Sequence, residues 1–143
     1  MTPDAKVRLE AVLDREIELG REFAAMLDAE RAALTGDSAA TVAERAAEKT
    51  ELLGRLERLD AERRGLCGDN WDANASEAIR ARWRSLLTVM ANCRAANEVN
   101  GYIVNARRGQ VRQLLDVLRG DPATTYGPQG KALAPALRAL ARA

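Results

Sequence analysis

Apolar residues recur at steps of three and four along three stretches of this chain. The stretches cover residues 4–34, 38–66 and 75–119, and this spacing places apolar side chains on one stripe of an α-helix. The turn-forming segments Gly36-Asp37-Ser38 and Cys67-Gly68-Asp69-Asn70 separate the three stretches. The pattern therefore predicts three long helices, of which the first two form an antiparallel hairpin.

The third stretch keeps its period through an Asn-Gly pair that would otherwise indicate a hairpin turn. Because apolar positions continue in phase on both sides of Asn100 and Gly101, we predict one helix of about 45 residues, roughly 65 Å long. Gly101 costs about 1 kcal/mol of helix propensity, so it serves a close backbone approach or marks a bend. Asn97 and Asn100 lie on the stripe, where their amides either fix the register of the bundle or bind a partner's backbone.

The predicted lengths leave the end of the third helix uncovered. A hairpin of helices of about 30 and 27 residues is roughly 40–45 Å long, so the third helix passes its end from about residue 105 to residue 119. This overhang carries Val111, Leu114, Leu115, Val117 and Leu118. Apolar side chains without a covering helix mark an interaction site or an oligomer interface.

The pattern changes after Gly120. Asp121-Pro122 ends the helix, and the segment that follows is not regular structure. Three leucines then recur at helical spacing in a basic segment that is too short to form a stable helix alone: Leu133, Leu137 and Leu140. We therefore predict an all-α protein with an elongated antiparallel three-helix bundle or coiled coil over residues 1–120. A flexible C-terminal tail, residues 121–143, contains a short amphipathic helix and binds a partner.

Composition supports helices and argues against catalysis. Of 143 residues, 47% are hydrophobic, 30% charged and 3% aromatic, which is too apolar for a disordered chain and poor in the residues that strands prefer. Histidine is absent, which removes the usual general base and the commonest metal ligand. Paired carboxylates such as Glu16 and Glu18 are expected to be solvated on helix surfaces. We therefore expect a binding protein without enzymatic activity, metal or cofactor.

Cysteine usage and hydropathy indicate the compartment. Cys67 and Cys93 form no Cys-x-x-Cys pair and are expected to pack as small apolar residues. The first residues lack the basic and apolar regions of a secretory signal, and no apolar run approaches the roughly 18 residues of a membrane span. We therefore expect a cytoplasmic protein with no stable membrane insertion.

Charge is divided unequally along the chain. Residues 1–66 carry 15 acids and 11 bases, whereas residues 67–143 carry 6 acids and 11 bases. The second half is therefore suited to an acidic partner, or to the first half itself. The arginines of the third predicted helix point to several faces and the net charge is +1, so we do not expect nucleic-acid binding.

Several motifs are spread over almost the whole chain. The first two helices carry Asp28-x-Glu30-Arg31-x-x-Leu34 and Glu48-Lys49-x-x-Leu52-Leu53-x-x-Leu56. The third helix carries Asn97-x-x-Asn100-Gly101-x-Ile103, then Gln110 and Leu114-Leu115-x-x-Leu118, and the tail carries Thr125-Tyr126-Gly127-x-x-Gly130. Many bundles share the helical motifs, whereas Asn-x-x-Asn-Gly followed at this distance by Tyr-Gly-x-x-Gly is more specific. On these motifs the chain resembles the FlgN family of flagellar export chaperones.

The resemblance implies a small cytosolic chaperone of flagellar type III export. Members of this family bind the hook–filament junction proteins FlgK and FlgL through the clients' C-terminal amphipathic helices, prevent premature assembly and deliver the clients to the export gate protein FlhA. Client binding belongs to the C-terminal part, and the tyrosine that docks on the gate corresponds to Tyr126, followed by Gly127. The Leu- and Arg-containing stretch after Lys131 is not a motif of the family, so its role rests on its pattern alone.

The resemblance and the apolar pattern together assign client binding to seven residues of the third helix and the tail. These residues are Val111, Leu114, Leu115, Leu118, Leu133, Leu137 and Leu140. A helix with an uncovered apolar side suits the capture of an amphipathic client helix. The alternative is a structural coiled-coil protein that forms a homodimer through the overhang of the third helix.

Overall fold

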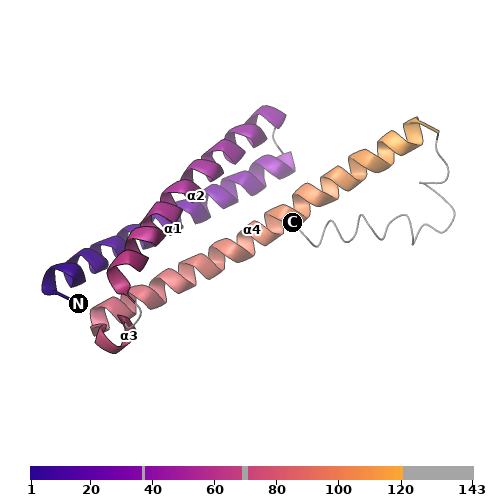
Figure 1. The fold of residues 1–143 in the computed structure, drawn as a ribbon. Helices are drawn as coiled ribbons and strands as arrows, with labels where there is room; N and C mark the ends of the chain where they lie inside the picture. Colours follow the sequence, from indigo (N-terminus) through magenta and orange to yellow (C-terminus); the bar gives the residue numbers. More distant parts are fainter. Residues whose placement is uncertain (37, 69–70, 121–143) are drawn as a thin grey trace. The chain divides into compact units, whose positions relative to one another are not determined.

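Four α-helices account for most of the residues that the structure describes. This computed structural model describes residues 1–36, 38–68 and 71–120. The helices are α1 (Pro3–Gly36), α2 (Ala39–Cys67), α3 (Trp71–Asn74) and α4 (Glu77–Leu118) (Figure 1). No strand occurs within these ranges, which confirms the prediction of an all-α helical bundle.

The three long helices begin and end within two residues of the predicted bounds. The single turn of α3 was not predicted, because it lies in a stretch rich in Gly, Asp and Asn that indicates a turn. The short amphipathic helix predicted for the tail lies outside the described residues.

Two compact units divide the chain, residues 1–96 and the residues from Asn97 on, and α4 contributes to both. In the first unit, α1 and α2 lie side by side as an antiparallel hairpin (Figure 1). One core cluster contains Leu19, Phe23, Met26, Leu27, Leu52, Leu59 and Cys93. The other contains Leu9, Leu13, Ile17, Ile79 and Leu86. Most of these residues belong to α1, which therefore supplies the centre of the first unit.

Hydroxyl side chains and two glycines with positive φ, Gly68 after α2 and Gly120 after α4, define the helix ends. The hydroxyl oxygens of Thr2, Ser38 and Ser76 accept hydrogen bonds from backbone N–H groups three residues further on, at 3.1, 3.4 and 3.2 Å. Such caps satisfy N–H groups that have no partner within the helix. At the other end of α4, Gly120 has a φ of 69°, and its N–H donates to the Val117 carbonyl at 3.0 Å. The left-handed conformation favours glycine and ends the helix where the sequence predicts.

One uninterrupted helix passes through Asn100 and Gly101, as the continuous period predicts. Its most buried residues follow one another at intervals of seven: Ile79, Leu86, Cys93 and Asn100, with exposed fractions of 0, 5, 3 and 1%. Asn97, which the pattern places on the same stripe, is exposed. The buried stripe of α4 is therefore narrower than the apolar period indicates. Asn97 lies four residues after Cys93 and three before Asn100, which places it at the edge of this stripe.

Two glutamates buried on α1 pair with basic residues of α2. The Nε atom of Arg63 lies 3.0 Å from Glu16 Oε2, and Lys49 Nζ lies 3.2 Å from Glu30 Oε1. Glu16 is only 3% exposed, so the expectation that it is solvated is wrong. Burial raises the pKa of the Glu16 carboxyl, and the charge of Arg63 counteracts this rise. The bases that interrupt the apolar period of α2 therefore compensate carboxylates that the fold removes from water.

Helices α1 and α4 approach each other closely at Gly20. A Cβ atom at this position would lie 2.7 Å from Val89 Cγ1. The Cys93 thiol donates a hydrogen bond to the Gly20 carbonyl at 3.3 Å. Burial raises the pKa of this thiol, so Cys93 stays protonated and packs as a small apolar residue, as the sequence predicts.

Gly20→Ala is expected to destabilise the protein. The added methyl group overlaps Val89 and costs about 1–3 kcal/mol, more than the roughly 1 kcal/mol that alanine gains over glycine in a helix. Gly65→Ala is the matched control, because nothing lies within 4 Å of a Cβ there, and it should raise stability by up to about 1 kcal/mol. Urea unfolding followed by circular dichroism measures both changes. Equal stabilisation by the two substitutions would contradict the close approach.

Candidate protein-docking site

The last turns of α4 carry an exposed apolar strip, which we call the α4 strip. It consists of Val111, Leu114, Leu115 and Leu118, with exposed fractions of 56, 59, 43 and 73%. Steps of three and four residues place these side chains on one side of the helix. Val117 lies beside the strip and is 55% exposed. The helix therefore presents a continuous apolar surface over about two turns.

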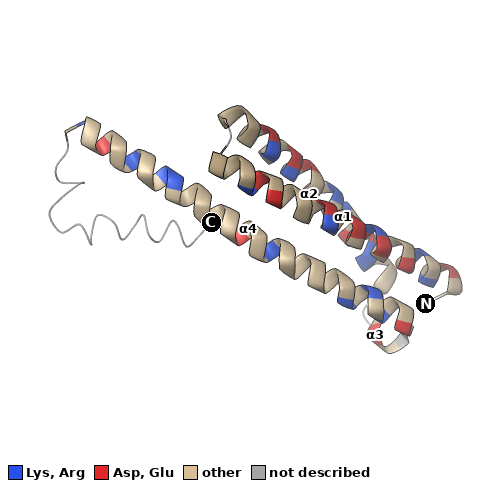
Figure 2. Ribbon diagram, turned by 180° about the vertical axis from the view of Figure 1, so that it is seen from behind, with Lys and Arg blue, Asp and Glu red and all other residues tan. Residues whose placement is uncertain are grey.

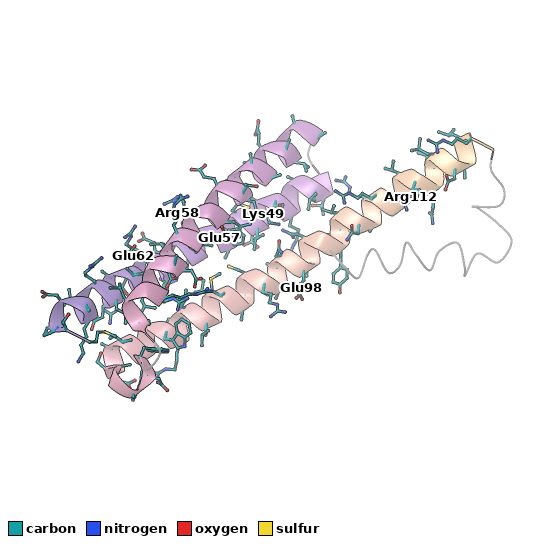
Figure 3. The ribbon with its side chains drawn as sticks, in the orientation of Figure 1. Lys49, Glu57, Arg58, Glu62, Glu98 and Arg112 are labelled. Atoms are coloured by element: carbon teal, nitrogen blue, oxygen red, sulfur yellow. The ribbon has the colours of Figure 1, made fainter. Side chains whose placement is uncertain are left out.

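Arginines border one edge of the α4 strip. Arg108, Arg112 and Arg119 are spaced by four and seven residues and so share one flank of the helix. Asp116 is the sole acid between residues 107 and 119, and blue predominates over this part of α4 in Figure 2. Arg112, labelled in Figure 3, makes no ion pair with any residue of the described part of the chain. The flank is therefore suited to carboxylates of a partner.

The remaining predicted site residues are distributed between buried, exposed and undescribed positions. Asn100 is 1% exposed, Gly101 is half-buried and Asn97 is exposed. An amide as buried as that of Asn100 is suited to fixing the register, whereas that of Asn97 is accessible to a partner. Five further predicted residues lie outside the described ranges: Tyr126, Gly127, Leu133, Leu137 and Leu140.

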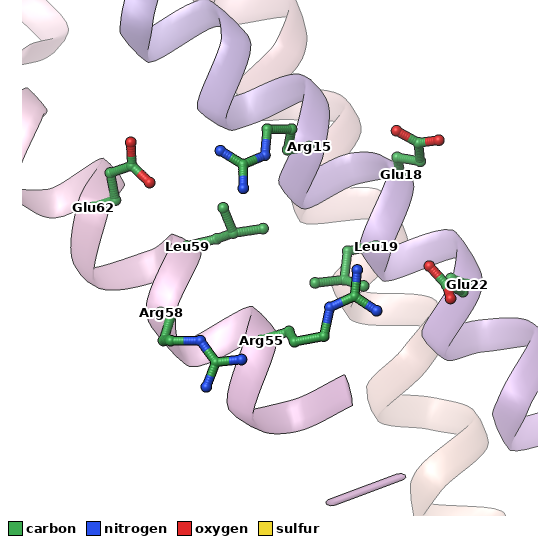
Figure 4. A pocket seen from close by; sticks show the side chains of 8 residues that line it. All are labelled: Arg15, Glu18, Leu19, Glu22, Arg55, Arg58, Leu59 and Glu62. Atoms are coloured by element: carbon green, nitrogen blue, oxygen red, sulfur yellow. The ribbon is translucent and has the colours of Figure 1, made fainter. Parts of the chain in front are cut away.

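A charged groove runs between α1 and α2 in the first unit. It is lined by Arg15, Glu18, Leu19 and Glu22 of α1 and by Arg55, Arg58, Leu59 and Glu62 of α2 (Figure 4). Leu19 and Leu59 at its base are only 4 and 7% exposed, so neither leucine is accessible there. Three bases and three acids give the groove no excess of either charge. It has the character of an ordinary solvated helix surface.

A second groove in the first unit is apolar and lies between α2 and α4. We call it the apolar groove; its volume is about 290 Å³. Leu53 of α2 and Leu87 of α4 line it and are 41 and 50% exposed. Sequence reasoning missed this surface because it followed the periodic stripes, which include Leu52 and Leu86, and gave the leucines beside them no role in docking. The signal was present in the pairs Leu52-Leu53 and Leu86-Leu87, since adjacent residues of a helix point about 100° apart.

The described residues offer neither a metal site nor a membrane span. Among them, no three His, Cys, Asp or Glu side chains come together in a way that could hold a metal ion. None of the described helices combines the length and the apolar character needed to cross a bilayer.

Sequence comparison identifies the family. A family model described as FlgN protein matches residues 1–134. The chain belongs to the FlgN family. Two curated relatives, the flagella synthesis proteins FlgN of Salmonella typhimurium strain LT2 and of Salmonella typhi, are each 28% identical over 130 residues, which cover 87% of this chain and 89% of the relative. No solved structure matches the chain.

Membership of the FlgN family confirms the resemblance carried by the motifs. The family is one of flagellar chaperones, so the chain takes part in building the flagellum by binding flagellar proteins. The match includes the whole α4 strip, Tyr126 and Leu133, but it ends before Leu137 and Leu140. The end of the tail is thus the part of the predicted site for which the family gives no support.

Leu114→Asp and Leu118→Asp are each expected to leave the fold intact. Both side chains are more than half exposed, so each substitution should lower the free energy of unfolding by less than about 1 kcal/mol. Leu27→Ala is the contrasting variant, because Leu27 is fully buried and its truncation should cost about 2–5 kcal/mol. Thermal and urea unfolding measure these values. A large loss of stability in either strip variant would mean that the strip is part of the core.

Proposed function

We propose that this chain is a cytosolic export chaperone of the flagellar type III secretion system, with the hook–filament junction proteins FlgK and FlgL as its clients. It binds their C-terminal amphipathic helices, prevents their premature assembly and delivers them to the export gate protein FlhA. The observation that carries this proposal is the α4 strip, a preformed helix surface whose leucines are accessible to a partner.

Client capture by the α4 strip follows from its chemistry. When an amphipathic client helix packs against Leu114 and Leu118, apolar surface of both partners is removed from water. This burial supplies the main favourable free energy of binding. The arginine flank attracts carboxylates beside the client's apolar stripe and favours one orientation of the helix. Three leucines of the tail, Leu133, Leu137 and Leu140, close over the client from a second side.

Delivery to the gate requires a surface that remains free when the client is bound. Tyr126 and Gly127 belong to the Tyr-Gly motif of the family and follow α4 directly in the sequence. A tyrosine combines a rigid apolar ring with a polar hydroxyl, and such residues are frequent anchors of protein interfaces. We assign gate docking to this motif and client binding to the leucines on either side of it.

Calorimetric titration with the C-terminal helical segments of FlgK and FlgL from the same genome tests client binding. The full chain should bind with micromolar or better affinity, about −8 kcal/mol or stronger. The double substitution Leu114→Asp with Leu118→Asp should weaken binding by more than about a hundredfold, because it places carboxylates in the apolar centre of the contact. A chain ending at Gly120 should bind the client segments more weakly, because it lacks the tail leucines that contribute to the contact.

Val7→Asp is the matched control for the strip variants. Val7 lies on α1 in the first unit and is 68% exposed, so its substitution places a carboxylate at an exposed apolar position without touching the strip and should leave the affinity unchanged. Absence of binding to both client segments, combined with a mass in solution that doubles with concentration, would instead support a homodimer formed through α4.

Tyr126→Ala should separate delivery from capture. The variant is expected to keep the client affinity of the unchanged chain and to lose binding to FlhA, measured with purified FlhA in the presence of the client segment. Tyr126→Phe should retain most of the gate binding if the ring carries the contact. Loss of client binding in Tyr126→Ala would show that the two sites are not separate.

A further inference from the structure

From the apolar groove between α2 and α4 we infer a second docking site, which takes an amphipathic helix of a protein partner with acidic residues on one flank and basic residues on the other. The groove lies within residues 1–96 and shares no residue with the α4 strip. The inference therefore does not depend on the proposed function of the strip.

Apolar side chains are accessible along the groove. Leu53 and Leu87 are 41 and 50% exposed on its two walls, and Leu56, Trp83 and Met90 line it in half-buried positions. The charged groove on the other side of α2 has no comparable surface, because its two leucines are almost fully buried. Within residues 1–96, the accessible leucines are therefore those of this groove, Leu53 and Leu87.

The dimensions and the surroundings of the groove suit a helix. Its wall on α4 extends from Trp83 to Met90, which corresponds to about 10 Å or two turns. An occupant of about two to three turns with apolar residues at i, i+3 or i+4, and i+7 matches this length. Such a helix would lie across both walls and complete a four-helix arrangement, the usual way in which antiparallel helices cover a shared apolar face.

Charge distinguishes the two edges of the groove. On α2, Glu57 lines the groove (labelled in Figure 3) and makes no ion pair with another described residue. On α4, Arg84 lies one turn before Leu87 on the same side of the helix and is paired only with the exposed Glu77, at 2.7 Å. An exposed pair of this kind contributes little and is readily exchanged. A partner helix with a base facing Glu57 and an acid facing Arg84 satisfies both edges and is held in one direction.

The need for a base facing Glu57 and an acid facing Arg84 favours a helix of another protein over a second copy of this chain. The α4 strip of another copy offers arginines to Glu57, but its opposite flank offers Gln110 and Gln113 to Arg84. It therefore meets only half of the charge pattern. Two apolar grooves also cannot fill each other, because both surfaces are concave.

Trp83 provides a reporter for occupancy of the groove. The chain has two tryptophans, Trp71 and Trp83, so the full-length Trp71→Phe variant emits from Trp83 alone. The probes are three tryptophan-free helical peptides of about 14 residues with the same leucine stripe, flanked by Lys on one side and Glu on the other, by Lys on both sides, or by Glu on both sides. The peptide with mixed flanks should give a saturable blue shift of Trp83 emission and bind about tenfold more tightly than the others.

Variants separate the groove from other surfaces. Leu53→Asp and Leu87→Asp alter exposed residues, so circular dichroism should be unchanged while affinity for the mixed peptide falls about tenfold or more. Glu57→Lys makes both edges basic and should transfer the preference to the peptide with Glu on both flanks. Val7→Asp on α1, which lies outside the groove and the α4 strip and alters a 68% exposed residue, is the matched control and should bind the mixed peptide like the unchanged chain.

Two results would overturn the inference. One is the absence of a saturable shift with the mixed peptide while the protein is folded. The other is a shift of Trp83 emission that depends on protein concentration alone, with a doubling of the mass in solution, which would assign the groove to a second copy. If Glu57→Lys still preferred the mixed peptide, the proposed charge complementarity at the edges of the groove would be wrong.

Discussion

Arg63 joins the three long helices within residues 1–96. Its guanidinium pairs with Glu16 of α1 and with Asp60 of α2, and it lies 4.8 Å from the centre of the Trp83 ring of α4. An unpaired charge at this depth would cost about 3–5 kcal/mol, so the crossing of α1 over α2 and the position of Trp83 are fixed together. Trp83 in turn meets Trp71 edge-on at 5.4 Å, which ties α3 to α4. One wall of the apolar groove is therefore positioned by a polar centre as well as by apolar packing.

Paired leucines explain why this small bundle leaves apolar surface accessible. In Leu52-Leu53 and Leu86-Leu87 the first leucine is 4 or 5% exposed, whereas the second is 41 or 50% exposed. The two side chains of each pair point about 100° apart, which is wider than the stripe that a helix buries against two neighbours. Helix α1, by contrast, supplies most of the buried core residues. The apolar sectors of α2 and α4 thus exceed what the three helices cover, and the excess is the surface for which we propose docking.

Periodicity predicted the helices well because each long helix buries a stripe at regular spacing. Asn100-Gly101 was assigned to a helix correctly, since burial of Cys93 and Asn100 requires one continuous period. Glu16 was wrongly predicted to be solvated. Its partner Arg63 is 47 residues away in the sequence, so the pairing that permits its burial is not visible in the local pattern. Leu53 and Leu87 were missed because the prediction followed the periodic stripes and gave the leucines beside those stripes no role. Which apolar residues remain accessible depends on how many helices pack around them. The periodicity of a single helix does not reveal that number.

The two surfaces differ in how they would hold a partner. The α4 strip is a convex side of one helix, so under the proposed function a client helix contacts α4 along one side only and is covered further only by the tail leucines. The apolar groove has two walls, and a helix seated in it contacts α2 and α4 at once, which increases the buried area per turn and slows dissociation. Under the proposed function, a chaperone that must give up its client benefits from such a difference in lifetime. Charge on the arginine flank would then speed capture and a contact with one helix would ease release, so that the client could be passed on without unfolding the chaperone.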